Sequence, residues 1–468
     1  STLPARSSWA SSGVLSSSTP CSILEQRQQA FRHTGNLDVV LDLIASSYHY
    51  VDHSTASILL DVLKESWPEL EMDNRIRELE KELADTAGYR SKRVQNPKYA
   101  EAPDGIAYNL GLALPEIDPD TREFAVSQQI YYGALKAVEE FNEQNEDKKV
   151  FIKYSNTYNK ASGSNEARST MNSLIWKDQV DAVLGPLFSE SAQHMKDLAE
   201  SYQIPLIAPM ANSDSLNMDN PYVWQANPTF AVRGRIMAEY AVKELKYDSL
   251  AVIAEANSLG SAAAYAFRTE VERLGGEVIY TFIEPLEEEG YDLAPYTERF
   301  TGNKKLRDSL NYKKVDAVYA PFTGQVAPTL IDLFLTDLEA SKSQVKLLGS
   351  QEWGNVDLDE DRMKKFTIHY TQAHHIDTSR ASVSRFKKEF NEQFGLQADR
   401  FAFIGYDIAH FLVNSLEQAE NPANLKKVIK EHEPYKGFSK TIHFDNRHIN
   451  QRMSIFKITK DGNREVSR

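Results

Sequence analysis

Short apolar runs and longer stretches of helical spacing alternate along the chain from residue 105 to its end. The apolar runs predict strands at 106–114, 151–154, 182–184, 206–208, 250–254, 277–282, 317–320 and 346–348, with 222–225 extended. The stretches between them predict helices at 125–144, 166–176, 192–199, 231–245, 261–274 and 325–339. Such alternation indicates an α/β fold with parallel sheets made of βαβ units. There are too many units for one sheet, so we expect two doubly wound lobes.

The N-terminal part has a different pattern. Residues 1–22 are rich in Ser and indicate a flexible leader, and residues 88–104 indicate a linker. Between them, residues 23–87 carry apolar positions at helical spacing, for example Ile76, Leu79 and Leu83, and predict a small helical module. The run Phe31–Asp38 resembles part of a tetratricopeptide helix pair, and the alternative is a plain helical cap on the next domain.

Composition narrows the range of partners. The 468 residues allow two to four domains, and the formal net charge of −14 disfavours nucleic acid and anionic lipid as ligands. No apolar run is long enough to predict a transmembrane helix.

Cys21 is the one cysteine, so no internal disulfide forms. We interpret it as an incidental residue of the leader, with a lipid-acceptor cysteine as the alternative.

The loops that follow the predicted strands are the candidate binding elements, because ligands of open α/β sheets bind at the carboxyl ends of the strands. Several of these loops are rich in Ser, Asn, Thr, Gly and aromatic residues, which suits a carboxylate or another small anion. Each is also an ordinary turn when taken alone. The loops are 116–122, 186–191, 209–215, 255–260, 321–325 and 350–355.

A resemblance to a known family rests on three motifs that occur in the order Val183–Ser191, Ile204–Ser213 and Tyr222–Gln225. The segments 316–319, 347–350 and 402–416 give it weaker support. The region Ile106–Ile458 resembles the type I periplasmic binding proteins, the leucine/isoleucine/valine-binding receptors of ABC transporters. The resemblance implies two lobes, one at about 105–227 and 377–437, the other at about 230–372 and 440–468, with the ligand trapped between them.

The resemblance also implies binding residues. Ser189, next to Phe188, stands where the family offers a hydroxyl and an N–H to the ligand carboxylate. Ala211 and Asn212, followed by Ser213, stand where the family offers a carbonyl and a threonine. An asparagine side chain still donates and accepts hydrogen bonds.

Several positions depart from the family pattern. Phe230 stands in place of an aspartate, Leu259 lies in a loop that lacks the family's tyrosine, and Thr323 falls near another tyrosine position. Gln351 replaces the acid that holds the ligand ammonium, although Glu352 is adjacent. A buried ammonium without a carboxylate is costly. Either Glu352 supplies that charge, or the ligand is not a free α-amino acid.

Other clusters in the chain hold residues of types that bind metal ions or carry out catalysis. Adjacent histidines on an extended segment point to opposite faces, and acidic runs are usually solvated. Ser189 has no histidine placed by sequence to activate it, and the common nucleophile, zinc-protease and phosphate-loop motifs are absent. We therefore expect no enzyme, no metal and no cofactor. The clusters are His374-His375 with Asp377, His443 with His448, and Glu287–Glu289.

These observations predict an extracytoplasmic solute-binding protein that takes a small polar ligand, an amino acid or related carboxylate, for an ABC permease. We expect a periplasmic or envelope-anchored protein, with an export signal removed ahead of Ser1. The alternative is a lipoprotein resembling the activators of penicillin-binding proteins, which join a helical repeat module to the same two-lobed domain. Such a protein regulates cell-wall synthesis by protein contact and needs no solute.

Overall fold

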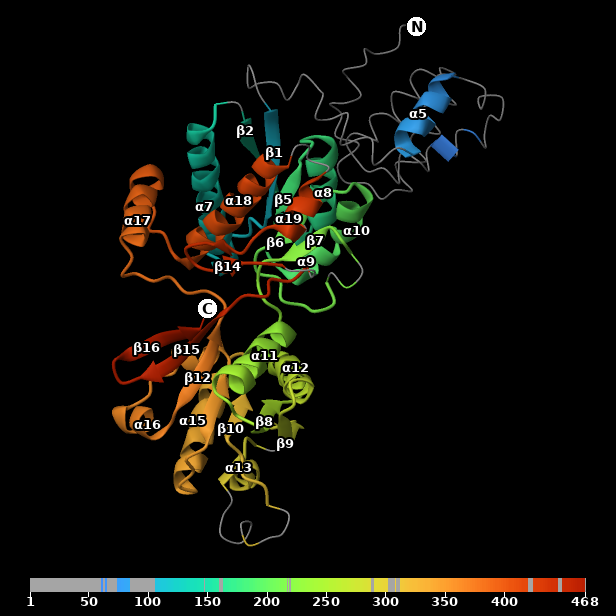
Figure 1. The fold of residues 1–468 in the computed structure, drawn as a ribbon. Coiled ribbons are helices and arrows are strands. Elements are labelled where there is room, and N and C mark those ends of the chain that lie inside the picture. The colour runs from blue at the N-terminus through green and yellow to red at the C-terminus, as the bar shows by residue number, and fades with distance from the viewer. Residues whose placement is uncertain are drawn as a thin grey trace. The chain divides into compact units, whose positions relative to one another are not determined.

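The computed structural model describes residues 60–61, 64, 74–84 and 106–467, apart from short gaps at 147, 160–162, 217, 219, 288–289, 302–307, 309–311, 420–423 and 445–447. The described residues form two compact units (Figure 1). Unit 1 holds the residues up to Met210 with Leu216–Trp224 and Phe401–His432. Unit 2 holds Ala211–Ser215, Gln225–Arg400 and Glu433–Arg468.

Two short helical parts of the predicted N-terminal module are described, and the longer one is continuous. The longer one is α5 (Asn74–Ala84), in which Ile76 is buried, and it agrees with the helical spacing predicted there. Most of residues 23–87, the leader 1–22, Cys21 and the linker 88–104 lie outside the described residues. The helical module and its tetratricopeptide resemblance therefore stay predictions.

Unit 1 is built on a sheet with the strand order β2-β1-β5-β6-β7. β1 runs parallel to β2 and β5, and β5 runs parallel to β6. The short strands β5 and β6 are wholly buried and apolar, as expected for a parallel sheet covered on both faces. The bounds are β1 Ile106–Leu114, β2 Lys148–Asn156, β5 Ala182–Leu184, β6 Leu206–Ala208 and β7 Val223–Gln225.

The helices of unit 1 include a close pair, α7 (Arg122–Gln144) and α18 (Arg400–Gln418). A Cβ on Gly133 of α7 would lie 2.0 Å from the Ala402 carbonyl oxygen, and one on Gly405 would lie 2.2 Å from that of Ile130. Only glycine permits this approach. The other elements are α8 (Ala167–Trp176), α9 (Ser189–Gln193), α10 (Lys196–Ser201), α19 (Leu425–Glu431), β3 (Tyr158–Asn159) and β4 (Ser164–Asn165).

Unit 2 is built on a seven-stranded sheet with the order β16-β15-β12-β11-β10-β8-β9. Five neighbouring strands of this sheet, β9, β8, β10, β11 and β12, run parallel to one another. β15 is antiparallel to β12, and β16 is antiparallel to β15. The strands are β8 Ser249–Glu255, β9 Glu277–Glu284, β10 Ala317–Ala320, β11 Lys346–Gly349, β12 Ile368–Gln372, β15 Ser454–Thr459 and β16 Gly462–Ser467. The sequence pattern did not predict β15 and β16, which add an antiparallel edge to the parallel strands and are joined by a tight turn as a hairpin.

Both faces of the unit 2 sheet are covered, as β10 shows. Val318 and Ala320 pack in the cluster that includes α15 (Ala327–Ala340), while Ala317 and Tyr319 pack in the one that includes α11 (Phe230–Glu239) and α12 (Leu259–Arg273) (Figure 1). The unit is therefore doubly wound, as predicted. Its other elements are η3 (Tyr240–Glu244), α13 (Ala294–Thr301), η4 (Gln351–Asn355), α16 (Glu360–Lys365), α17 (Ala381–Phe394), β13 (Tyr435–Lys436) and β14 (Thr441–Ile442).

The predicted elements agree with the structure where the pattern is strong. The strands at 106–114, 182–184, 206–208 and 317–320 have the predicted bounds. The predicted helix through residues 192–199 is instead two short helices, α9 and α10, and the helix at 231–245 ends in the π-helical turn η3. Among the described residues, no helix has the length and apolarity that crossing a membrane requires.

Candidate functional site

Three loops of unit 2 meet at one edge of its sheet. β8, β10 and β11 are neighbouring parallel strands, so the loops that begin at Ala256, Pro321 and Ser350 lie side by side at their carboxyl ends. Most of the predicted site residues of unit 2 follow these strands. The topology therefore places them at the usual binding edge of an open α/β sheet.

The β8 and β10 loops are joined by a hydrogen bond. The Gly260 backbone N–H donates to Thr323 Oγ1 over 3.2 Å, and a Cβ on Gly260 would lie 2.0 Å from the Pro321 carbonyl oxygen. The start of α12 thus approaches the β10 loop as only glycine allows. Leu259 is 56% exposed beside this contact. The predicted residues Leu259 and Thr323 are therefore brought together.

The β11 loop is held by two buried hydrogen bonds. Ser350 Oγ donates to the Phe322 carbonyl over 2.5 Å, and Trp353 Nε1 donates to the Ala320 carbonyl over 2.8 Å. Gln351 and Glu352 lie half-buried between these anchors. Within the described residues, Glu352 Oε2 is buried and has no hydrogen-bond partner. A buried carboxylate oxygen without a donor is unfavourable, so this atom is ready to accept one.

The segment Ala211–Ser215 is tied to the start of α11. Thr229 caps the helix and its hydroxyl also donates to the Asp214 carboxylate. Gln225 Nε2 donates to the Ser213 carbonyl over 3.0 Å. The predicted residues Ala211, Asn212 and Ser213 therefore belong to unit 2 and lie next to the helix that carries Phe230.

Sequence reasoning missed Arg233, one turn after Phe230. Its side chain is buried, with the residue 5% exposed, and the guanidinium lies 4.4 Å from the centroid of the Phe230 ring. Nε donates to the Pro228 carbonyl over 3.0 Å, and Nη2 donates to Asn227 Oδ1 over 3.4 Å. The sequence does point to Arg233, because it lies three residues after the candidate Phe230 and residues three apart lie on the same face of a helix.

Electrostatics link Arg233 to the β10 and β11 loops. Burial lowers the pKa of Arg233, and the negative charges of Glu352 and Asp214 oppose that shift, as does Tyr319. Burial also raises the pKa of Tyr319, so its phenol stays neutral. In the described part of the chain no carboxylate forms an ion pair with Arg233 at 4.0 Å or less. Arg233 and Glu352 thus provide opposite charges at one edge of the sheet.

The predicted residues Phe188 and Ser189 belong to unit 1, in the turn after β5. Gly185 begins the turn with φ +117, and a Cβ there would lie 2.2 Å from the Ala113 carbonyl oxygen. Phe188 is 47% exposed and precedes α9, which begins at Ser189. The structure groups these two residues in one unit and the other predicted residues in the second.

Two residues of the histidine cluster, His375 and Asp377, make contacts within unit 2. His375 packs its ring 4.6 Å from that of Phe456, and Asp377 accepts hydrogen bonds from the Ser379 N–H and hydroxyl. Burial, with Lys440, Arg233 and Arg400, lowers the pKa of His374 well below its usual value. No group of residues suited to holding a metal ion occurs among those described.

Comparisons with known proteins identify the fold of the chain. A family model described as "Periplasmic binding protein" matches residues 119–463. No curated protein sequence matches the chain. Solved structures with the same fold include a branched-chain amino acid ABC transporter protein from Rhodospirillum rubrum, at 19% identity and TM-score 0.60, covering 77% of this chain and 100% of that one.

Two further structures have comparable similarity. An ABC transporter substrate-binding protein from Desulfitobacterium hafniense, in complex with Leu, is 16% identical with a TM-score of 0.52 and covers 77% of this chain and 100% of its own. One from Sphaerobacter thermophilus is 17% identical with a TM-score of 0.53 and covers 77% and 97%. At these identities the likeness establishes the fold.

Proposed function

The chain belongs to the periplasmic binding protein family, and from that premise we propose that it is an extracytoplasmic receptor for an amino acid or a closely related amino-carboxylate. Members of the family are solute-binding proteins, and known structures with this fold include ABC transporter substrate-binding proteins. We propose delivery to an ABC permease on the same grounds. Lipid anchoring stays a prediction.

The proposed class of ligand rests on Arg233 and Glu352. A buried guanidinium binds a carboxylate in a two-pronged geometry, and a buried carboxylate oxygen without a donor accepts from an ammonium. Together these opposite charges suit a zwitterion. Of the two alternatives at the Gln351 position, the proposal takes the one in which Glu352 supplies the missing charge.

The remaining site residues complete the proposal. Asn212, Ser213 and Thr323 offer polar groups in unit 2, and Phe230 and Leu259 offer apolar surface. We propose Ser189 and Phe188 as the contribution of unit 1, from the turn after β5. The expectation that two lobes enclose the solute stays a prediction. The alternative function, regulation by protein contact, rested on the helical module and on the missing amino-acid charge pair, and the comparisons support solute binding over it.

The test is a thermal-shift and calorimetry panel of amino acids, the matching carboxylates without an amine, and the matching amines. We expect at least one amino acid to raise the melting temperature, since a ligand at about 100 times its Kd stabilises by roughly 2.7 kcal/mol. Arg233→Met and Glu352→Gln should each weaken binding at least about tenfold, the loss of one charge-assisted hydrogen bond.

Two variants on α12 control for changes in charge alone. Arg268→Met and Glu272→Gln alter a partly exposed pair separated by 3.9 Å and should leave the affinity unchanged. The proposal fails if no compound of the panel binds. It also fails if the carboxylate without an amine binds as tightly as the amino acid and Glu352→Gln has no effect.

A further inference from the structure

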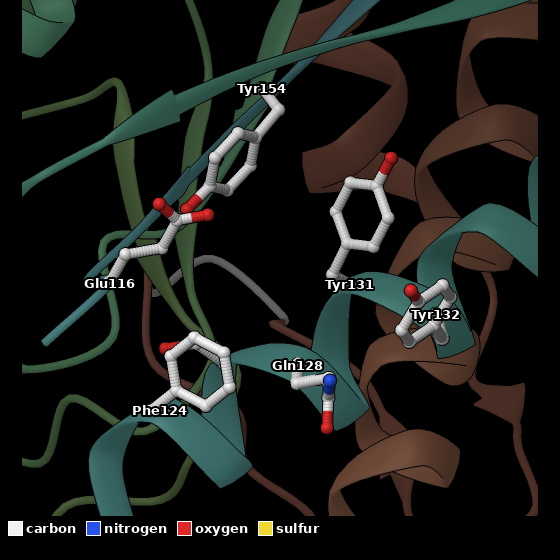
Figure 2. A pocket seen from close by; sticks show the side chains of 7 residues that line it. Glu116, Phe124, Gln128, Tyr131, Tyr132 and Tyr154 are labelled. Atoms are coloured by element: carbon white, nitrogen blue, oxygen red, sulfur yellow. The ribbon is translucent and has the colours of Figure 1, made fainter. Parts of the chain in front are cut away.

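A pocket lies wholly within unit 1, between the N-terminal half of α7, the end of β2 and the loop after β1 (Figure 2). Its volume is about 290 Å³, at the small end of the range for small-molecule sites. None of the predicted ligand-binding residues lines it. The pocket is therefore separate from the site proposed above.

Aromatic rings form most of the wall. The rings of Tyr131 and Tyr154 meet edge to face at 5.6 Å, and those of Tyr131 and Tyr132 do so at 5.3 Å. Phe124, about two helical turns before Tyr131 and Tyr132 on α7, adds a fourth ring. Rings set at right angles present both faces and edges to one space, as in the aromatic cages that bind methylated ammonium groups.

Two of the tyrosine rings, those of Tyr131 and Tyr154, are held neutral by burial. Burial raises the pKa of Tyr154 above its ordinary value, and the nearby Glu116 carboxylate raises it further. Burial also raises the pKa of Tyr131, with smaller contributions from Tyr132 and Glu139. Neutral phenols keep the electron-rich ring faces that attract a cation, and they add no charge that would draw in metal ions.

One carboxylate supplies the charge of the pocket. Figure 2 shows the Glu116 carboxylate beside the Tyr154 hydroxyl, which donates to the Leu114 carbonyl over 3.5 Å. The backbone of Glu116 is held in place, since its N–H donates to Asn156 Oδ1 over 2.8 Å at the end of β2. The lining contains no lysine, arginine or histidine. A positively charged ligand therefore meets attraction without competition from a resident cation.

A buried hydroxyl also faces the pocket. Ser127 is 4% exposed, and its Oγ has no hydrogen-bond partner within the described residues. A buried hydroxyl normally has a partner, so this one is available to a polar group of a ligand. Gln128, the next residue of α7, adds an amide at the pocket.

From this arrangement we propose that the unit 1 pocket binds a small organic cation with a methylated ammonium group. The Tyr131, Tyr132, Tyr154 and Phe124 rings surround the methyl groups, Glu116 balances the charge, and Ser127 accepts or donates a hydrogen bond to a hydroxyl of the ligand. The site takes a ligand of a different class from the zwitterion of the unit 2 site.

The experiment compares choline with 3,3-dimethylbutan-1-ol, which has the same shape and no charge, by calorimetry on the full chain. We expect choline to bind at least about tenfold more tightly than the alcohol, because the aromatic rings and the Glu116 carboxylate attract its charge. Equal binding of the two would show an apolar pocket without cation recognition and would overturn the proposal. Failure of both choline and tetramethylammonium to bind would overturn it as well.

Three variants locate the binding. Tyr131→Leu should weaken choline binding about tenfold, Tyr131→Phe should keep it within about threefold, and Glu116→Gln should weaken it and remove most of its salt dependence. Tyr265→Leu, at an exposed tyrosine of α12, is the matched control. Unchanged binding in Tyr131→Leu would place the cation elsewhere and refute the assignment.

A failure of the choline proposal can be distinguished from a failure of the amino-acid proposal. Arg233→Met removes the proposed amino-acid site in unit 2 and should leave choline affinity unchanged, because the two sites share no residue. Loss of choline binding in that variant would mean that choline occupies the unit 2 site, and it would refute the separate pocket.

Discussion

Replacing Arg233 by methionine tests the central electrostatic argument in the absence of any solute. The substitution keeps an unbranched side chain but removes the hydrogen bonds to the Pro228 carbonyl and Asn227 Oδ1 and the contact with the Phe230 ring. It also leaves Glu352, with its buried Oε2, without the nearby cation. Relief of the guanidinium's own desolvation offsets part of this loss, so we expect a net cost of about 2–4 kcal/mol.

The double-mutant cycle with Glu352→Gln isolates the interaction between the two charges. Glu352→Gln alone removes a charge that stabilises the Arg233 guanidinium, and we expect it to cost about 1 kcal/mol. In the Arg233→Met background its cost should fall or change sign, giving a coupling energy of about 0.5–3 kcal/mol. Residues in one buried electrostatic network show coupling of this size.

The assay is urea unfolding at pH 7 followed by tryptophan fluorescence, in which the buried Trp353 reports on the same loop. Arg268→Met, which removes a partly exposed surface pair, should cost less than about 1 kcal/mol. If the two site substitutions add within about 0.3 kcal/mol, the charges do not interact and the reasoning is refuted. A stabilising Arg233→Met would refute it too.

Two further predictions concern stability. Burial and the Lys457 ammonium lower the pKa of His369 from 6.5 to about 4, so the unfolded chain binds a proton that the folded chain excludes. The free energy of unfolding should therefore fall as the pH decreases from about 6.5 to 4, and His369→Gln should flatten this dependence while His194→Gln, at an exposed histidine, should not. Gly133→Ala places a Cβ 2.0 Å from the Ala402 carbonyl oxygen and should cost about 3 kcal/mol or more in urea unfolding. Exposed Ala125→Gly should cost less than about 1 kcal/mol, and equal costs would contradict the close packing of α7 on α18.

The pattern of apolar and polar residues predicted the strands and helices well where one face, or both faces, of the element is buried. The apolar runs Ala182–Leu184, Leu206–Ala208 and Ala317–Ala320 are strands because both faces of each sheet are covered and no polar position interrupts them. The π-helical turn at Tyr240–Glu244 was not predicted, since its apolar spacing differs little from that of an α-helix. The antiparallel hairpin of β15 and β16 also escaped prediction, because pairing direction depends on the neighbouring strand.

The pattern predicted which loops follow strands, and the structure places three of these loops side by side, since carboxyl ends of parallel strands share an edge. The resemblance to the family, and not the loop pattern, singled out Thr323, Gln351 and Glu352 within them, and their role in binding stays a prediction. Arg233 lies within a helix, and no rule about loops points to it. The aromatic pocket of unit 1 was missed for a similar reason, because Tyr131 and Tyr154 come from a helix and a strand that are ordinary by pattern.

The sequence by itself determined the α/β class, the main strands and helices, and the resemblance to the periplasmic binding family, because hydrophobic periodicity and motif order are properties of neighbouring residues. Only the tertiary structure decided that Arg233 and Glu352, far apart in the chain, lie close enough for their charges to interact. It also decided that Glu116 meets the tyrosines of α7 and β2. The physical reason is that Coulomb interaction and desolvation depend on distance and burial in space, which the order β11-β10-β8 in one sheet and β2-β1 in the other creates.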